Sequence, residues 1–139
     1  MEIIIMARTF QKFLQSKIDL SSVGLEFRED NAPYFCTPKG SSIFGWAGVD
    51  GIHFCFIRSF GSMVFSINPM NSSPNFVHPL ARNFSDFLSL ILACGDASTL
   101  EQSCMWDEAQ FEAFLQDNPP TQDQQRTLLE LAEKMKLTP

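Results

Sequence analysis

The chain has 139 residues, of which 45% are hydrophobic and 19% are charged, and its formal net charge is −6. This length matches one domain, and the fourteen phenylalanines exclude a disordered chain. No sequence repeat with a period of ~20–50 residues is present, which excludes a solenoid or a propeller. The acidic balance disfavours nucleic acid and anionic membranes as ligands, because both require clustered cations.

The first predicted element is a helix over 6–18. Its apolar residues follow one stripe at helical spacing: Met6, Phe10, Phe13, Leu14 and Ile18. Ser21, Ser22 and Gly24 then end the helical pattern. The segment that follows, 25–33, carries four charged residues and is predicted to be a polar connector.

From residue 34 to 81 short β-branched and aromatic runs alternate with turn residues, which predicts an antiparallel meander. The predicted strands lie near 42–47, 52–58, 63–68 and 75–80, with a further candidate near 34–37. Asp50 and Gly51 predict a type I′ turn between the first two strands, because both residue types tolerate positive φ. Pro79 cannot donate to a neighbouring strand, so the last strand is expected at an edge of the sheet.

Alternation along the second and third strands predicts one apolar face of the sheet, formed by Ile52, Phe54, Phe56, Met63, Phe65 and Ile67. The opposite face then carries His53, Cys55, Ile57, Val64, Ser66 and Asn68. Only four of the fifty residues 34–83 are charged. We therefore expect the sheet to be largely covered, or part of it to face a partner.

Three helices are predicted after the sheet, over about 83–95, 107–117 and 121–136. Asn83 is expected to cap the first, and Gly95 to end it. Trp106 and Phe111 suit a hydrophobic staple around the N-cap Asp107. Thr121 and Gln124 suit a capping box.

The predicted fold is therefore a single α+β domain over 1–139, with an antiparallel meander sheet of four or more strands over about 34–81. The N- and C-terminal helices are expected to pack on this sheet. The helix 83–95 is expected to cover its Phe54, Phe56 and Phe65 face.

The sequence indicates no catalytic, cofactor-binding or metal-ligating residue. His53 and Cys55 share a strand face, and Cys36, His78 or Cys104 could complete a tetrahedral zinc site, but the spacing matches no zinc motif. A half-buried histidine beside a buried thiol is the ordinary interpretation. No nucleophile elbow, P-loop or dinucleotide-binding fingerprint occurs, so we predict that the chain is not an enzyme.

The cysteines and the start of the chain favour a cytoplasmic protein. Cys36, Cys55, Cys94 and Cys104 form no C-x-x-C pair, which predicts free thiols in a reducing compartment. Glu2 and the short apolar run after it do not resemble a signal peptide. No apolar run approaches the ~18 residues of a membrane span.

Charge is distributed unevenly towards the C-terminus. No Lys or Arg lies between Arg82 and Arg126, whereas eight acidic residues do. One interpretation is a solvated face that aids solubility, and the other is a docking face for a basic protein. The candidate partner-binding residues are Asp96, Glu101, Asp107, Glu108, Glu112 and Asp117. The nearly uncharged sheet face around His53, Cys55 and Ile57 is the alternative surface.

Three blocks of the sequence resemble the SUKH superfamily, which includes fungal cell-wall and glucan-synthesis regulators and many bacterial relatives. They are GIHFCF at 51–56, GSMVF at 61–65 and VHPLARNFSDFL at 77–88, and the last matches the family pattern A-x-x-F-x-x-F-L. The resemblance covers about 42–95. The family's N-terminal L-P-x-x-[LY]…N-G block is absent, and the helices after Cys94 lie outside the shared core.

The resemblance implies an α+β sheet with packed helices and no catalytic residues. Many bacterial members look like immunity proteins that neutralise contact-delivered toxins, often nucleases, and the fungal branch is linked to cell-wall assembly. By analogy, we expect a non-enzymatic immunity-type protein that neutralises a basic toxin domain. The alternative is a regulatory interaction protein of the cell-wall regulator type.

Overall fold

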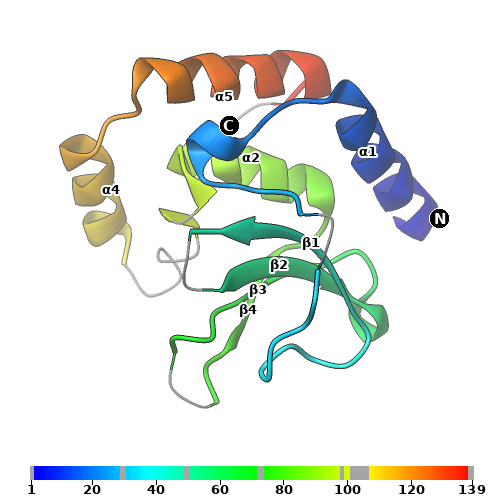
Figure 1. Cartoon of the computed structure of the whole chain (residues 1–139). Helices are drawn as coiled ribbons and strands as arrows, with labels where there is room; N and C mark the ends of the chain where they lie inside the picture. Colours follow the sequence, from blue (N-terminus) through cyan, green and yellow to red (C-terminus); the bar gives the residue numbers. More distant parts are fainter. Residues whose placement is uncertain are drawn as a thin grey trace.

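The computed structural model describes residues 2–28, 31–48, 51–71, 74–97, 99–100 and 107–137, and within 2–8 it describes the backbone only. The elements run in the order α1 (Glu2–Ser16), the 3₁₀ helix η1 (Ser21–Val23), β1 (Ser41–Ala47), β2 (Ile52–Ile57), the 3₁₀ helix η2 (Arg58–Phe60), β3 (Val64–Ile67), β4 (Val77–Ala81), α2 (Phe84–Cys94), α4 (Glu108–Asp117) and α5 (Gln122–Met135). Figure 1 shows α1, α2 and α5 on one side of the sheet and the segment that precedes β1 on the other. The fold is α+β, as predicted.

The sheet is an antiparallel meander with the strand order β1-β2-β3-β4, which confirms the predicted topology. Ala47 pairs with Ile52, so four residues separate the paired ends of β1 and β2 instead of two. Asp50, the first residue of the predicted type I′ turn, lies outside the described residues, whereas Gly51 has a φ of 78°. The candidate strand near 34–37 is wrong, because the Thr37 amide bonds the Tyr34 carbonyl and closes a turn there.

The register between β2 and β3 corrects one prediction about the two faces of the sheet. Cys55 lies opposite Phe65, and Phe54 lies opposite Ser66. Since directly opposed residues share a face, Phe65 lies with Cys55 and not with Phe54. Alternation within each strand defines two faces, but only the register between strands decides which faces coincide.

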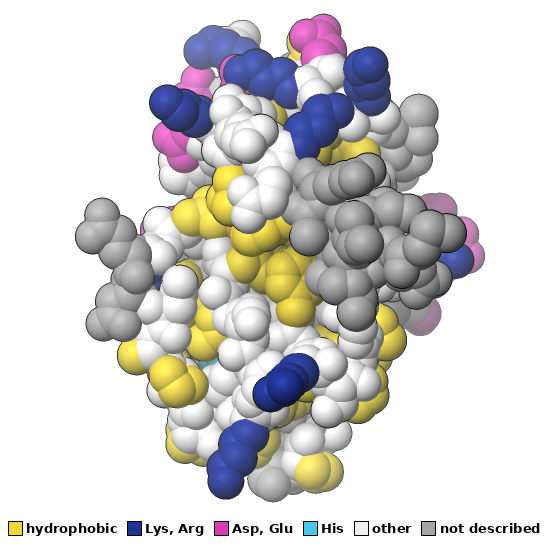
Figure 2. All heavy atoms as spheres, turned by 90° about the vertical axis from the view of Figure 1, so that its right-hand side faces the viewer, with side chains coloured by type: hydrophobic (Ala, Val, Ile, Leu, Met, Phe, Trp, Pro, Cys, Tyr) yellow, Lys and Arg dark blue, Asp and Glu magenta, His cyan; other side chains and the backbone are white. Residues whose placement is uncertain are grey.

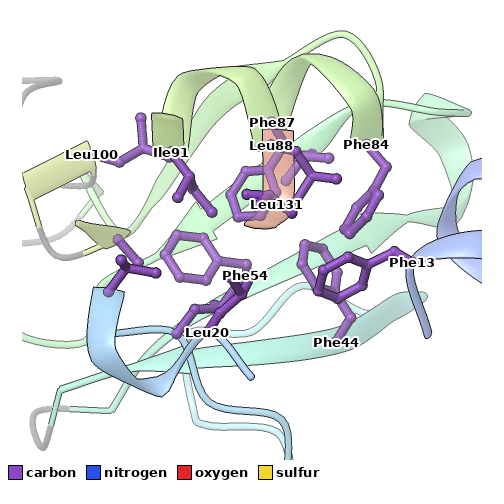
Figure 3. Packing of buried hydrophobic residues seen from close by; sticks show 14 of the residues in the cluster. Phe13, Leu20, Phe44, Phe54, Phe84, Phe87, Leu88, Ile91, Leu100 and Leu131 are labelled. Carbon is purple, nitrogen blue, oxygen red and sulfur yellow. The ribbon is translucent and has the colours of Figure 1, made fainter. Parts of the chain in front are cut away.

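The larger core lies between the sheet and α2. Phe54, Phe84 and Phe87 have no exposed surface, and the Phe54 and Phe87 ring centroids lie 5.3 Å apart. Figure 3 shows the α2 side chains facing Phe44 and Phe54 of the sheet. Leu20, from the N-terminal part of the chain, lies near Phe54 in the same cluster. Segments from both ends of the chain therefore complete one core.

A smaller core lies on the opposite face of the sheet. Its buried members are Cys55, Ile57, Phe65 and Ile67. Cys36, from the segment that precedes β1, packs against them. The side chains of His53, Cys55 and Ile57 are therefore buried by the chain itself.

Local capping signals confirm the predicted helices. The Asn83 side chain accepts the Asp86 amide at 2.8 Å, and Gly95 adopts a left-handed φ of 79° after α2. The Thr121 capping box opens α5. The first helix ends earlier than predicted, at Ser16, although Ile18 is still buried. Trp106, and with it the predicted staple, lies outside the described residues.

Replacing Phe54 by alanine should lower the free energy of unfolding by ~3–5 kcal/mol, because the ring is buried in the larger core and its removal leaves a cavity. Urea unfolding measures this loss. Met70, which is 70% exposed, provides the control, since Met70→Ala should change the free energy by less than about 0.5 kcal/mol. Equal losses in the two variants would contradict the placement of Phe54 in the core.

Candidate functional site

The helix α4 lies at the edge of the main core, against which its half-buried Phe111 packs. Figure 1 shows α4 and α1 at opposite ends of α5. No described side chain of α4 is buried. Its apolar stripe, Phe111, Phe114 and Leu115, is only half-buried. The stripe faces inward, as its spacing suggests, yet the protein covers it incompletely.

Local interactions account for where α4 begins and ends. The Asp107 carboxylate accepts a hydrogen bond from the backbone N–H of Gln110 at 2.8 Å. In return, the side-chain oxygen of Gln110 accepts one from the backbone N–H of Asp107 at 3.0 Å. This capping box begins the helix. At its end the Asn118 side chain donates to the Phe114 carbonyl at 3.0 Å, and two prolines follow. Asp107 is therefore a capping residue, although its side chain remains exposed.

The other acidic residues of α4 lie on its solvent-exposed flanks. Glu108 and Glu112 are exposed and one turn apart, so they share a flank beside the apolar stripe. Asp117 is exposed on the opposite flank. Within the part of the chain that the structure describes, none of the three forms an ion pair. Glu101 lies outside the described residues.

Asp96, the remaining predicted residue, lies across a groove from α4. It follows the Gly95 cap of α2, and its carboxylate accepts the Thr99 amide at 3.3 Å. The same carboxylate lies close to Gly24, where an added Cβ would come within 3.0 Å of Asp96 Oδ2. Folding therefore brings Asp96 and α4 to two sides of one groove.

This groove has a volume of about 580 Å³ and lies between the end of α2, α4 and the start of α5. Its described lining residues are Leu92, Ala93, Cys94, Gly95, Asp96, Thr99, Phe114, Leu115, Asn118, Pro119, Pro120, Gln124 and Leu128. Asp96 is the one charged residue among them. The volume is typical of ligand-binding clefts, and polar and apolar groups line the groove in similar amounts.

Basic side chains gather elsewhere on the molecule. Figure 2, seen from the α1 side, shows most of the visible Lys and Arg at the end formed by α5 and α1, together with some Asp and Glu, and fewer basic side chains at the sheet end. The exposed lysines of these two helices include Lys12 and Lys134. On α5, Arg126 is exposed and pairs with Asp123 at 3.7 Å. The acidic flank of α4 therefore faces solvent away from most of the protein's own cations.

A second cluster, which the sequence did not predict, lies on the outer side of the sheet. The Trp46 ring centroid lies 4.8 Å from that of His53 and 5.7 Å from that of Tyr34. The Arg28 guanidinium carbon lies 4.6 Å from the Trp46 ring centroid. Trp46 Nε1 also donates to Asn31 Oδ1 at 2.8 Å. These contacts fix the segment before β1 against the sheet. The sequence could not predict the cluster, because the spacing of residues does not show which separate segments meet.

Hydrogen bonds occupy both ring nitrogens of His53. Nδ1 lies 2.7 Å from the Gly51 carbonyl oxygen, which only accepts, so Nδ1 carries the proton. In the neutral ring Nε2 then accepts from the Thr37 hydroxyl, 2.8 Å away. Burial lowers the pKa of His53 and so favours the neutral ring, whereas the hydrogen bond to Gly51 acts in the opposite direction and is the smaller effect. His53 therefore acts here as a structural residue that holds the segment before β1.

The cysteines in the described residues do not form a reactive site. Burial raises the pKa of Cys55 to about 11, so its thiol stays protonated and is a poor nucleophile. Burial also raises the pKa of the half-buried Cys36. Cys94 is buried, and Cys104 lies outside the described residues. Within the described part of the chain, no three His, Cys, Asp or Glu side chains are grouped so that they could hold a metal ion.

Comparison with protein-family models, curated proteins and solved structures finds no match. The SUKH resemblance, and the functions that it implies, therefore rest on the three sequence blocks. Among the described helices, none combines the length and the apolar character needed to cross a membrane.

The stability of the protein should decrease as the pH falls below about 6.5, the ordinary pKa of histidine. The unfolded chain takes up a proton on His53 near this pH, whereas the folded chain does so only at lower pH. Between the two pKa values the unfolded state binds more protons, so acid favours unfolding, and above this window the contribution is constant.

Urea unfolding at several pH values measures this dependence. The control is His53→Asn, whose amide can still donate to the Gly51 carbonyl but does not titrate. The variant should show a shallower decrease over the same window. Identical slopes in the two proteins would contradict a buried neutral His53.

Chelation should leave the stability unchanged, because the nitrogens of His53 are engaged within the protein and Cys55 is protonated. In a structural zinc site the binding energy contributes to the folding energy, so EDTA would lower the unfolding midpoint. The measurements are thermal unfolding with and without EDTA and elemental analysis of the purified protein. Nearly one equivalent of zinc, together with a lower midpoint in EDTA, would show that the prediction is wrong.

Proposed function

We propose that this chain is a non-enzymatic protein-binding domain and that α4 docks a basic partner. The observation that carries the proposal is the unfinished packing of α4, whose apolar stripe is half-buried and whose acidic flanks are exposed. A partner that covered Phe111, Phe114 and Leu115 would remove apolar surface from water. Its basic residues would meet Glu108 and Glu112.

Charge and burial have different roles in such an interface. Exposed rim charges mainly accelerate association through attraction that salt screens over about 8–10 Å. The apolar stripe contributes to affinity once the surfaces meet. Because α4 contributes no buried residue, these charges can be changed with little effect on the main core.

The binding role that we favour is neutralisation of a basic toxin domain, as in the bacterial immunity proteins of the SUKH superfamily. Sequestration by an acidic surface would suit a nuclease, whose own substrate is an anion. The alternative, suggested by the fungal branch, is a regulatory interaction in cell-wall assembly. Both roles use the same surface, and the identity of the partner distinguishes them.

Replacing Glu108 and Glu112 by glutamine and Asp117 by asparagine should slow association with the partner several-fold at low salt and much less at high salt. The matched control neutralises three exposed acids of α5, as Asp123→Asn, Glu130→Gln and Glu133→Gln. Both variants change the net charge by the same amount, so a difference between them reports the location of the acids. Urea unfolding checks that both variants fold.

The partner is found by affinity capture from the native host followed by mass spectrometry. We expect a basic protein that the wild type and the α5 control retain and that the α4 variant retains poorly. For the toxin role, co-expression of the wild type should restore the growth of cells that produce the captured protein. Equal association rates for the two variants at low salt would contradict the docking role of α4. The acidic residues would then serve solubility only.

A further inference from the structure

We infer that protonation of His53 opens the turn 34–37, which covers the smaller core, while the rest of the fold stays in place. The turn is then an acid-sensitive cover on the side of the sheet away from α2. Three observations support this: how the turn is attached, what His53 contributes to that attachment, and what surrounds a positive charge on its ring. The proposed function of α4 is independent of it.

The turn 34–37 covers the smaller core but is itself poorly buried. Of the described apolar residues that pack on the buried members of this core, Cys36 alone comes from outside the sheet and its turns. Figure 1 shows the segment before β1 on the side of the sheet away from the helices. Tyr34 is 41% exposed and Phe35 is 80% exposed. Few buried contacts predict a low free energy of local opening.

His53 attaches the turn to the strands through both sides of its ring. On one side Nδ1 donates to the Gly51 carbonyl at 2.7 Å. On the other side Nε2 accepts from the Thr37 hydroxyl at 2.8 Å, and the Thr37 oxygen accepts in turn from the backbone N–H of Tyr34 at 2.9 Å. The Tyr34 and His53 ring centroids also lie 5.6 Å apart. Both ends of the turn therefore depend on His53.

The residues that flank the turn have attachments that do not involve His53. Asn31 Oδ1 accepts from Trp46 Nε1 at 2.8 Å, and the Pro38 carbonyl accepts from Ser41 Oγ at 2.7 Å. None of these four groups changes its charge near neutral pH, so the two bonds do not depend on the protonation of His53. The turn can therefore open between two fixed points.

A positive charge on His53 would lie among aromatic and aliphatic side chains. The His53 side chain has no exposed surface. The neighbouring strands place Trp46 and Ile67 directly opposite it, and the turn places the Tyr34 ring beside it. Tyr34 is the titratable group among these neighbours. None of the three side chains carries a negative charge that would stabilise the imidazolium.

The charged groups that reach this cluster do not offset a charge on His53. The Arg28 guanidinium carbon lies 4.6 Å from the centroid of the Trp46 ring, so a charged His53 would bring a second cation to that ring. The Glu26 carboxylate is paired with Arg28 at 3.6 Å. In the described part of the chain no carboxylate pairs with His53. Burial therefore dominates and lowers the pKa of His53.

Protonation also disrupts the hydrogen bond to Thr37. Nε2 accepts in the neutral ring and donates in the charged ring, so the Thr37 oxygen would receive two donors and its own proton would lose its acceptor. Opening the turn relieves this conflict, because water then solvates both groups. Below the ordinary histidine pKa of about 6.5, the opening constant should increase about ten-fold per pH unit until the closed form also takes up the proton.

The reaction of a buried thiol measures this opening in the full chain. Cys55 has no exposed surface and belongs to the smaller core, so a reagent reaches it only when the core opens. The reagent is 4,4′-dithiodipyridine, which reacts with thiols at acidic and neutral pH, and mass spectrometry of peptide fragments identifies the labelled cysteine. The rate for Cys55, divided by the rate for a short peptide of residues 52–57, gives the opening constant.

We expect the opening constant at Cys55 to exceed the unfolding constant from urea experiments at least ten-fold, and to increase about ten-fold between about pH 7.5 and about pH 5.5. His53→Asn, which does not titrate, should show no such increase. His78→Asn removes the other histidine of the chain and should behave as the wild type. Thr37→Val should raise the opening constant several-fold at neutral pH, because it removes the link to His53.

Several results would overturn the inference. An opening constant equal to the unfolding constant would show that only global unfolding exposes Cys55. A constant that does not change with pH, or that increases equally in His53→Asn, would show that His53 does not control the opening. A Thr37→Val chain that opens as the wild type does would show that Thr37 does not hold the turn. An NMR titration of the wild-type His53 ring needs no substitution, and a midpoint at or above about 6.5 would also overturn the inference.

Discussion

The packing of α2 on the inner face of the sheet is the contact on which the rest of the structure depends. Phe84 and Phe87 meet Phe44, each at 5.4 Å between ring centroids, and Phe87 also meets Phe54. Phe13 reaches the same cluster from α1 and lies 5.4 Å from Phe84. The helices α1 and α2 and the sheet thus share one aromatic cluster, and Leu131 and Met135 of α5 complete the same hydrophobic core.

The other face of the sheet needs no helix, because the segment before β1 covers it. Trp46 and His53 project from the strands to meet Tyr34, and Thr37 links that segment to His53 through a hydrogen bond. A histidine and two cysteines that might suggest chemistry are consequently part of a small structural core. Among the described α-helices, α4 is the one with no buried side chain, and it lies at the end of the molecule away from α1.

Under the proposed function, stability and recognition would depend on different parts of the molecule. The core between α2 and the sheet depends on burial, whereas α4 begins and ends through its own capping interactions and contributes no buried residue. Such an element can change its charged residues with little effect on the core, which suits a surface that must match a particular partner. It also leaves the apolar stripe of α4 half-exposed.

The sequence by itself determined the features that depend on residues close together in the chain. Asn83, Asp107 and Thr121 were recognisable as caps because each bonds a residue three positions away, and the exposure of Glu108, Glu112 and Asp117 followed from helical periodicity. Tertiary structure alone decided which face Phe65 occupies, since a register between strands joins residues that no local pattern relates. For the same reason only folding could bring Asp96 to the groove opposite α4, because that groove is formed where three separate helices meet.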